Sequence, residues 1–500
     1  MSPFTRFLTT ASLAALLAAC SQPSAPTQGE AGTTPETSNA STASASTDTA
    51  ATQAAESERL MAWFDSLFQE DLARSPLTQT ALGQIDDLDA YGRWDDVSEQ
   101  AAIDANERSI ERLAYLRENF DPDQLSADAR VSYLIYEYLQ ETGIRNFAFR
   151  DQTYIFTQMF GPHTGLPTTL INRHRVENID HANAYIRRLE GLGPVLRDLI
   201  GQADARAEAG VMPPLFAFDY LIGNTANIVT GAPFDDSETD SPLLADFRSE
   251  IGDLEIDEQT REDLLIRAIA ALESSVGPAY AELIAMFERH QAMTDERDGA
   301  WKLPRGEEYY QAQLATFTTL PDLSASEIHQ TGLDEIARIH DEMRAIQEQV
   351  GFEGTLQDFF EFMRTDEQFY YPSTAEGRAR YLAEVNAIFE RVNAVVPDYF
   401  GVTPRGAMEV REVEAFRAAG SPSAFYNTGS IDGTRPGIYY ANTLNMRNLP
   451  VYQMETLAYH EGIPGHHFQL TLALERENSP MFQRQLYLSA FGEGDRKSVV

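Results

Sequence analysis

Apolar residues recur in this sequence at the spacing of an α-helix over long stretches, and this periodicity restricts the fold more than any other feature. Residues three and four apart share one face of a helix, so each such run predicts a helix with an apolar face directed into a core. Three runs show the pattern clearly: Val131, Leu134, Ile135 and Tyr138; Ile336, Ile339, Met343, Ile346 and Val350; and Leu382, Val385, Phe389, Val392 and Val396. The sequence therefore predicts a mainly α-helical body.

Two of these runs carry signals for where their helices begin or end. Ser324 and Glu327 match a capping box, in which the two side chains satisfy backbone donors of the first turn, so a helix is predicted to begin at Ala325. Gly351 predicts the end of that helix, because glycine readily adopts the left-handed conformation that follows many helices. Pro397 likewise predicts the end of the third run.

The apolar period changes after about Gly401. Residues 408–413 partly alternate between apolar and polar side chains, and Asp432-Gly433 predicts a turn before the β-prone run at residues 438–440. A helical pattern returns over residues 454–461. We therefore expect a small sheet next to the helix that carries His460 and Glu461.

Residues 1–20 have the features of a targeting segment. Arg6 is the early positive charge, a mostly apolar run follows it, and small residues precede Cys20. The run is too short to span a membrane as a helix. Its end resembles a bacterial lipobox, which implies lipidation of Cys20 and membrane attachment through that lipid alone, whereas an ordinary signal peptide with a chance cysteine is the alternative. By the same resemblance, Ser21 implies the outer membrane, facing the periplasm.

Residues 21–56 are rich in Ser, Thr, Ala, Pro, Gln and Gly and have almost no large apolar residue. Such a segment cannot bury enough surface to fold, so it is predicted to be a disordered linker. Helical apolar spacing returns with Leu60 and Phe64, which places the start of the folded domain near Ser57 and its extent at residues 57–500.

Charge and cysteine content exclude some partners and some kinds of site. Lys and Arg number 38 against 77 Asp and Glu, which gives a formal net charge of −39. A surface this negative repels phosphate backbones, so nucleic acid is not expected as a partner. The chain has one cysteine, so it can form no disulfide within itself, and a metal site must use histidines and carboxylates.

The segment His460–His467 carries the strongest chemical signal. It contains three of the nine histidines, and Glu461 follows the first of them directly. In the familiar zinc helix the two histidines are four residues apart and therefore on one face, but here they are six or seven apart. On an unbroken helix this spacing separates them by roughly 9 to 10 Å along the axis, too far for one metal ion. The helix must therefore break, and Gly462, Pro464 and Gly465 allow it to do so.

Such a break would return His466 to His460, and we prefer His466 to His467 as the second ligand of a Zn²⁺ ion without excluding His467. A catalytic zinc site takes three protein ligands and keeps one open position. Glu493, which follows an apolar-periodic stretch, is the candidate for the third ligand. A satisfied polar cluster or a solvated surface patch is the alternative explanation for a histidine-rich helix end.

Three segments together resemble a known family: Tyr426–Asn442, Glu455–Leu457 and His460–Gln469. They are similar to the bacterial family called domain of unknown function 885, whose members resemble zinc metallopeptidases of the thimet oligopeptidase and carboxypeptidase Taq type. The resemblance extends from about Ser57 to Gly494. It implies a large helical, metallopeptidase-like body around a deep substrate cleft, a single zinc ion and hydrolysis of peptides.

The chain departs from the family pattern after Gly494. Members of the family continue with a Trp and a further helical segment, whereas this sequence ends with Asp495–Val500. The resemblance implies a chain that is truncated at its C-terminus. Glu493 would then lie in the final turns, where fraying removes the precision that a metal site needs, so we expect impaired activity.

The sequence thus predicts zinc-dependent peptide hydrolysis with Glu461 as the general base. His467 is a further candidate for substrate binding. The strand at residues 439–442 with Tyr440 could pair with a peptide backbone, with Asn442 capping that pairing, but a plain core strand explains this segment equally well. Arg435 could hold a substrate carboxylate. Two alternatives belong to other classes of protein: an envelope lipoprotein that binds zinc in order to deliver it, and a noncatalytic envelope lipoprotein.

Overall fold

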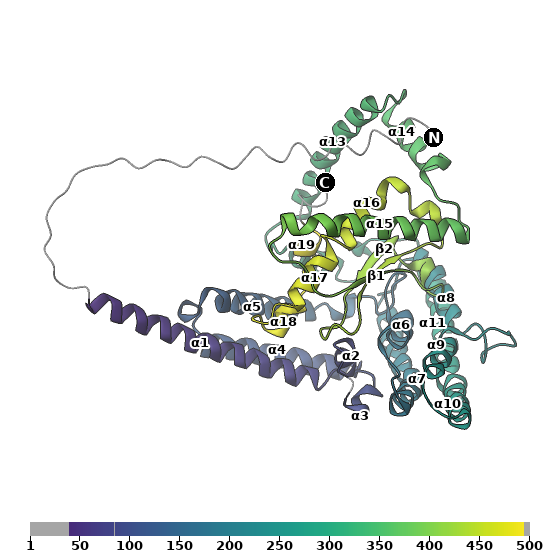
Figure 1. Cartoon of the computed structure of the whole chain (residues 1–500), viewed down its shortest axis with the longest axis horizontal. Coiled ribbons are helices and arrows are strands. Elements are labelled where there is room, and N and C mark those ends of the chain that lie inside the picture. Colours follow the sequence, from purple (N-terminus) through teal and green to yellow (C-terminus); the bar gives the residue numbers. More distant parts are fainter. Residues whose placement is uncertain (1–39, 85, 495–500) are drawn as a thin grey trace. The chain divides into compact units, whose positions relative to one another are not determined.

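The computed structural model describes residues 40–84 and 86–494 (Figure 1). The chain divides between Thr52 and Gln53 into two compact units, and the text below concerns the second unit. That unit is mainly helical with one small sheet, as predicted. Within the described ranges, no helix combines the length and the apolar character that crossing a membrane requires. The predicted signal peptide with Cys20, and the linker up to residue 39, lie outside the described residues.

Most of the helices precede the sheet. In chain order they are α1 (Ala40–Leu72), α2 (Pro76–Ala81), α3 (Leu88–Tyr91), α4 (Glu99–Asn119), α5 (Ala127–Phe147), α6 (Pro162–Arg173), α7 (Ile179–Glu208), α8 (Leu215–Ile228), α9 (Pro242–Gly252), α10 (Glu258–Ala271), α11 (Gly277–Met293), α12 (Gly306–Thr318), α13 (Ala325–Gln349), α14 (Leu356–Thr365) and α15 (Ala375–Tyr399). Four shorter ones follow the sheet: α16 (Val451–Glu461), α17 (His466–Leu474), α18 (Met481–Arg484) and α19 (Ser489–Gly492).

Helix α1 begins earlier than the sequence analysis places the start of structure. Its first residue is Ala40, so residues 40–56 are helical and the prediction of a disordered linker is wrong for them. This stretch is rich in alanine, the residue with the highest helix propensity, and a helix can therefore form without an apolar face. The first large side chains of the core are Leu60 and Phe64, as expected.

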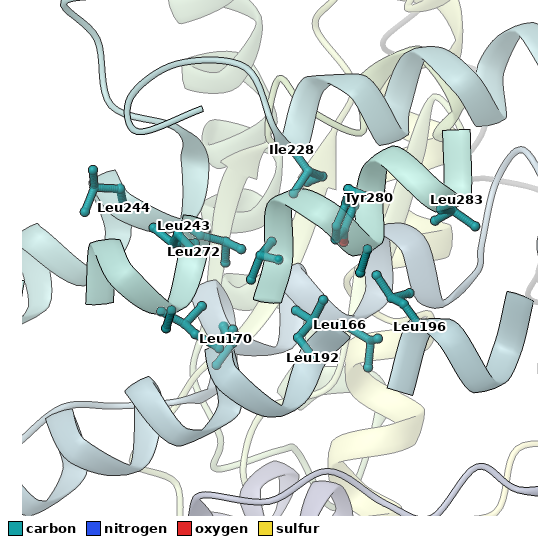
Figure 2. Packing of buried hydrophobic residues seen from close by; sticks show 14 of the residues in the cluster. Leu166, Leu170, Leu192, Leu196, Ile228, Leu243, Leu244, Leu272, Tyr280 and Leu283 are labelled. Atoms are coloured by element: carbon teal, nitrogen blue, oxygen red, sulfur yellow. The ribbon is translucent and has the colours of Figure 1, made fainter. Parts of the chain in front are cut away.

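The largest core lies among α6 to α11. Figure 2 shows fully or nearly fully buried residues of these helices packed together: Leu166, Leu170, Leu192, Leu196, Ile228, Leu243, Leu244, Leu272, Tyr280 and Leu283. Helix α7 contributes Tyr185, Leu189, Leu192, Leu196 and Leu199, whose spacing of three and four residues places them along one face. This core is separate from the elements that carry the histidine motif.

A second core joins α15, the sheet, α16 and α17. The predicted run on α15 faces it, with Val385, Phe389, Val392 and Val396 buried and Leu382 partly buried. Pro397 lies inside the last turn and the helix continues to Tyr399, so the predicted end is two residues early. The residues that carry the histidine motif therefore rest on a packed layer.

Two predicted helices are present, but their buried faces were assigned wrongly. On α5, Val131 and Leu134 are exposed, whereas Tyr133 and Tyr136 are buried. Tyr136 contacts Phe64 and Phe482 of other helices, and Tyr133 belongs to the same cluster. Large aromatic side chains remove more apolar surface from water than the aliphatic residues would.

Helix α13 begins at Ala325 with the predicted capping box and is followed by Gly351 in the left-handed conformation. Its apolar stripe is nevertheless solvent-facing, because Ile336 and Ile346 are each 52% exposed. Among the described residues α13 packs on α14, and Gln347 and His340 lie on the side that meets it.

The predicted sheet consists of β1 (Met408–Glu412), β2 (Ala424–Asn427) and β3 (Gly437–Ala441), in the order β1-β3-β2. Strand β3 pairs with β1 in parallel and with β2 in antiparallel fashion. All residues of β3 are buried. Tyr439 packs toward α15 and α16, whereas Tyr440 packs on the opposite face with Val413 and Phe425.

Candidate metal centre

The histidine motif spans two helices, as its Gly and Pro residues predict. Helix α16 ends at Glu461 and α17 begins at His466. Gly465 precedes α17, and its backbone runs so close to α16 that a Cβ atom on it would lie 1.9 Å from the carbonyl oxygen of His460. Glycine is therefore the residue that permits this return of the chain.

The break brings the first two predicted ligands together. The rings of His460 and His466 lie with their centroids 4.5 Å apart. Each of these residues and Glu461 offers one potential ligand atom, and the three atoms lie within 4.8 Å of one another. Histidines six residues apart in sequence thus occupy the relative positions that the familiar zinc helix gives to histidines four apart.

Glu493 joins this group from a third segment of the chain, at the end of α19. Its Oε2 lies 3.2 Å from Nε2 of His460, and its Oε1 lies 3.3 Å from Nε2 of His466. Ligands that each lie about 2.0 to 2.1 Å from a tetrahedral ion are separated by about 3.3 Å. Two imidazoles and one carboxylate are also a donor set of catalytic zinc sites, so both the geometry and the chemistry of these residues fit a zinc ion.

Glu461 lies beside this group in a more buried position. Its side chain is 11% exposed, and its Oε2 is 3.9 Å from Nε2 of His466. Burial and, after it, the charge of Glu493 raise the pKa of Glu461 to about 7, against the opposing effect of a hydrogen bond from the backbone of Tyr426. A carboxylate with a pKa near neutrality is suited to accept and return protons.

His466 and His467 point to different surroundings, which separates the two alternatives for the second ligand. Burial and the neighbouring His460 lower the pKa of His466, which favours the neutral imidazole that binds metals. His467 is buried, with its Nδ1 2.9 Å from the hydroxyl of Tyr426 and 3.3 Å from that of Thr471. Burial lowers the pKa of His467 to about 4. The structure therefore brings His466, not His467, to His460.

The side chain of Arg435 is hydrogen-bonded to backbone carbonyl groups of two other segments. Its guanidinium group donates to the carbonyl oxygens of Thr428 at 2.9 Å and Ala81 at 3.1 Å. Burial and, after it, the nearby positive charge of Arg173 lower the pKa of Arg435 to about 10. These bonds tie the loop before β3 to the end of α2, so the structure gives Arg435 a structural task.

Tyr440 and Asn442 do not reach the metal centre, and the predicted pairing of their strand with a substrate is wrong. Both edges of β3 are already hydrogen-bonded, to β1 and to β2. Tyr440 is buried on the far face of the sheet, where its ring stacks on that of Phe425. Asn442 donates to the carbonyl oxygens of Ala418 at 2.7 Å and Ser421 at 3.0 Å.

Tyr487 lies at the site although the sequence analysis does not identify it. Its hydroxyl donates a hydrogen bond to Oε1 of Glu493, and its ring centroid is 6.0 Å from that of His466. Burial, the bond to Glu493 and the charges of Glu493 and Glu461 raise its pKa, so the phenol keeps its proton. The one sequence signal that could have identified Tyr487 was its position six residues before Glu493, but Tyr487 is not part of any periodic pattern.

Comparison with known proteins shows which solved structures have a similar fold. A search of curated proteins gave no significant match. Two solved structures, both of putative lipoproteins, resemble the chain. The structure from Colwellia psychrerythraea has a TM-score of 0.76 at 24% sequence identity. The alignment covers 88% of this chain and 76% of the Colwellia chain. The one from Shewanella oneidensis, of unknown function, has a TM-score of 0.54 at 16% identity and covers 87% and 75%.

A family profile gives the more extensive match. The family described as bacterial protein of unknown function (DUF885) matches residues 76–494, which include the sheet, the histidine motif and Glu493. The match spans most of the chain, including the core of α6 to α11 and the core of α15 to α17 with the sheet. The chain therefore belongs to this family.

Proposed function

We propose that this protein is a zinc-dependent peptide hydrolase of the cell envelope. His460, His466 and Glu493 would hold the ion, and Glu461 would act as the general base. Zinc, when bound, supplies polarisation of the scissile carbonyl and activation of a water molecule. Glu461 accepts a proton from the attacking water at its carboxylate and later delivers it to the amine that leaves.

One observation carries the proposal. The carboxylate of Glu493 lies 3.2 and 3.3 Å from two imidazoles that come from two other segments, while a second carboxylate, that of Glu461, stands beside them without occupying the same position. A structural site or a carrier site has no need of the second, buried carboxylate, whose desolvation costs free energy. Its presence favours hydrolysis over storage or delivery of the metal.

The two carboxylates differ in ways that suit different tasks. Glu493 is 48% exposed and contacts both imidazoles, as a ligand must. Glu461 is mostly buried and lies farther from His466, at 3.9 Å, so it stands beside the proposed ligands as a general base must. The general base is therefore assigned to Glu461.

The proposed location follows from the N-terminal sequence. We propose that Cys20 carries a lipid that anchors the protein to the outer membrane, facing the periplasm. The lipobox-like end of the targeting segment supports this, as do two structural relatives that are described as lipoproteins. The substrates would then be peptides present in the periplasm.

A metal assay combined with a peptide-cleavage assay tests the function. The wild-type chain should bind one zinc ion and, at the reduced rate that the sequence analysis expects, cleave peptides measurably, whereas Glu461→Gln should keep the zinc and lose that activity by roughly 10²- to 10⁴-fold, the usual contribution of general acid–base catalysis. Zinc binding without any hydrolysis would indicate a metal-delivery lipoprotein instead. No zinc in the wild-type chain would remove the basis of the proposal.

A further inference from the structure

Glu493 is less constrained by its own segment than the two histidines are by theirs. It follows α19, which spans Ser489–Gly492, and its side chain is 48% exposed. An exposed glutamate samples several rotamers, and fixing it in one costs conformational entropy. Something outside α19 must therefore contribute to holding its carboxylate between the two imidazoles.

Tyr487 makes the contact that can do so. Its hydroxyl donates to Oε1 of Glu493, the oxygen that lies 3.3 Å from Nε2 of His466. The other oxygen, Oε2, lies 3.2 Å from Nε2 of His460. A hydrogen bond to Oε1 therefore fixes the rotation of the carboxylate plane between the two rings.

The ring of Tyr487 is itself held in place by the residue before Glu493. A Cβ atom on Gly492 would lie 2.7 Å from Cε2 of the ring and 3.0 Å from its hydroxyl oxygen, so the ring rests directly on the backbone at Gly492. On its other side the ring approaches His466 with an interplanar angle of 67°. Two contacts thus orient the phenol toward Glu493.

We infer that Tyr487 is a positioning residue of the metal centre, whose hydrogen bond holds Glu493 in the orientation that a metal ligand needs. The inference rests on the proposed function, because it takes Glu493 as a ligand of zinc. Carboxylate ligands in metalloproteins commonly have such hydrogen-bond partners, and loss of a partner lowers metal affinity about 10- to 100-fold.

The first test measures zinc affinity directly, by competition with a chelating dye. Tyr487→Phe keeps the ring and removes the hydroxyl, so it should raise the zinc dissociation constant about 10- to 100-fold. Tyr459→Phe is the matched control, because Tyr459 donates a similar hydrogen bond, 2.6 Å long, to Glu455 on the exposed side of α16. The control should bind zinc as the wild-type chain does.

A double-mutant cycle then separates positioning from direct contact with the ion. If Tyr487 acts through Glu493, Tyr487→Phe should leave the zinc dissociation constant unchanged in a Glu493→Ala background. An equal weakening in both backgrounds would overturn the inference, because Tyr487 would then act on the metal without Glu493. Turnover at saturating zinc gives a second criterion: a large loss of kcat with unchanged zinc affinity would make Tyr487 catalytic and would also overturn it.

Gly492→Ala perturbs the same contact without touching the hydroxyl. The added methyl group should displace the ring and raise the zinc dissociation constant in the same direction as Tyr487→Phe. Failure of the inference is distinguishable from failure of the proposed function. If the wild-type chain binds zinc and Tyr487→Phe binds it equally well, only the role of Tyr487 is lost. If the wild-type chain binds none, both are lost.

Discussion

At the scale of single residues, neighbours in sequence have opposite environments. His466 faces His460 and Glu493, whereas His467 is buried against Tyr426. The sequence favours His466 through the preceding glycine but leaves His467 open, because the geometry of the break between the helices decides which ring returns. The role of Tyr487 could not be predicted from the sequence, since its hydrogen bond to Glu493 depends on how two short helices pack.

We expect alanine substitutions of the two histidines to have different effects. His466→Ala should abolish stoichiometric zinc binding with little change in stability, because it removes a proposed ligand. His467→Ala should retain zinc but lower the free energy of unfolding by about 1 to 3 kcal/mol, because it removes a buried side chain that is hydrogen-bonded to Tyr426 at 2.9 Å. Metal analysis and urea denaturation of both variants check this, and loss of zinc from His467→Ala alone would reverse the assignment.

At the scale of secondary-structure elements, the sequence predicts which elements exist better than it predicts what they pack against. The helices at α5, α13 and α15, the capping box and the small sheet are present as predicted, whereas strand β2 was not predicted. The buried face is right on α15 and wrong on α5 and α13, because periodicity shows which residues share a face but not whether another element covers it. The order of the strands could not be predicted from the sequence either. For this reason the predicted substrate-binding role of Tyr440 was wrong.

Matched isoleucines test the difference between the two long helices. Ile388 on α15 is buried, so Ile388→Ala should lower the free energy of unfolding by about 2 to 5 kcal/mol. Ile336 on α13 is 52% exposed, and Ile336→Ala should change it by about 0.5 kcal/mol or less. Urea denaturation of both variants gives the comparison. A large loss for Ile336→Ala would show that its stripe is covered in solution.

The connection between α16 and α17 allows a prediction about the metal centre. Gly465→Ala should weaken zinc binding strongly, because its new Cβ atom would lie 1.9 Å from the carbonyl oxygen of His460 and would force the two helices apart. Gly201→Ala is the control, since Gly201 lies within α7 with no neighbouring atom within 4 Å of its added Cβ. The control should stabilise the chain by about 0.5 to 1 kcal/mol without affecting zinc.

At the scale of the whole unit, its two largest cores divide the tasks. The core of α6 to α11 is remote in sequence from the histidine motif, whereas the core of α15 to α17 with the sheet supports that motif. Apolar periodicity correctly predicted a mainly helical body, but it could not show that the core of that body is divided. Because the core is divided, titrating groups in the larger core can change the stability of the whole unit.

Asp246 is such a group, and it should make stability depend on pH. Burial raises its pKa to about 7, while the hydrogen bond from Tyr185 opposes this, and the unfolded value is close to 3.8. Between pH 4 and pH 7 the folded chain therefore binds more protons than the unfolded chain, so the free energy of unfolding falls as the pH rises, by up to about 1.4 kcal/mol per pH unit. Asp246→Asn should flatten that fall in urea denaturation across this range; an unchanged slope would contradict the assignment.

The return of the chain at Gly465 has a consequence for maturation. Because the three donors come from α16, α17 and the residue after α19, the complete donor set assembles only when these three segments have docked, and tight capture of the cation must await that docking. Stripping the cation should accordingly loosen the C-terminal quarter first and leave the bundle of α6 to α11 intact.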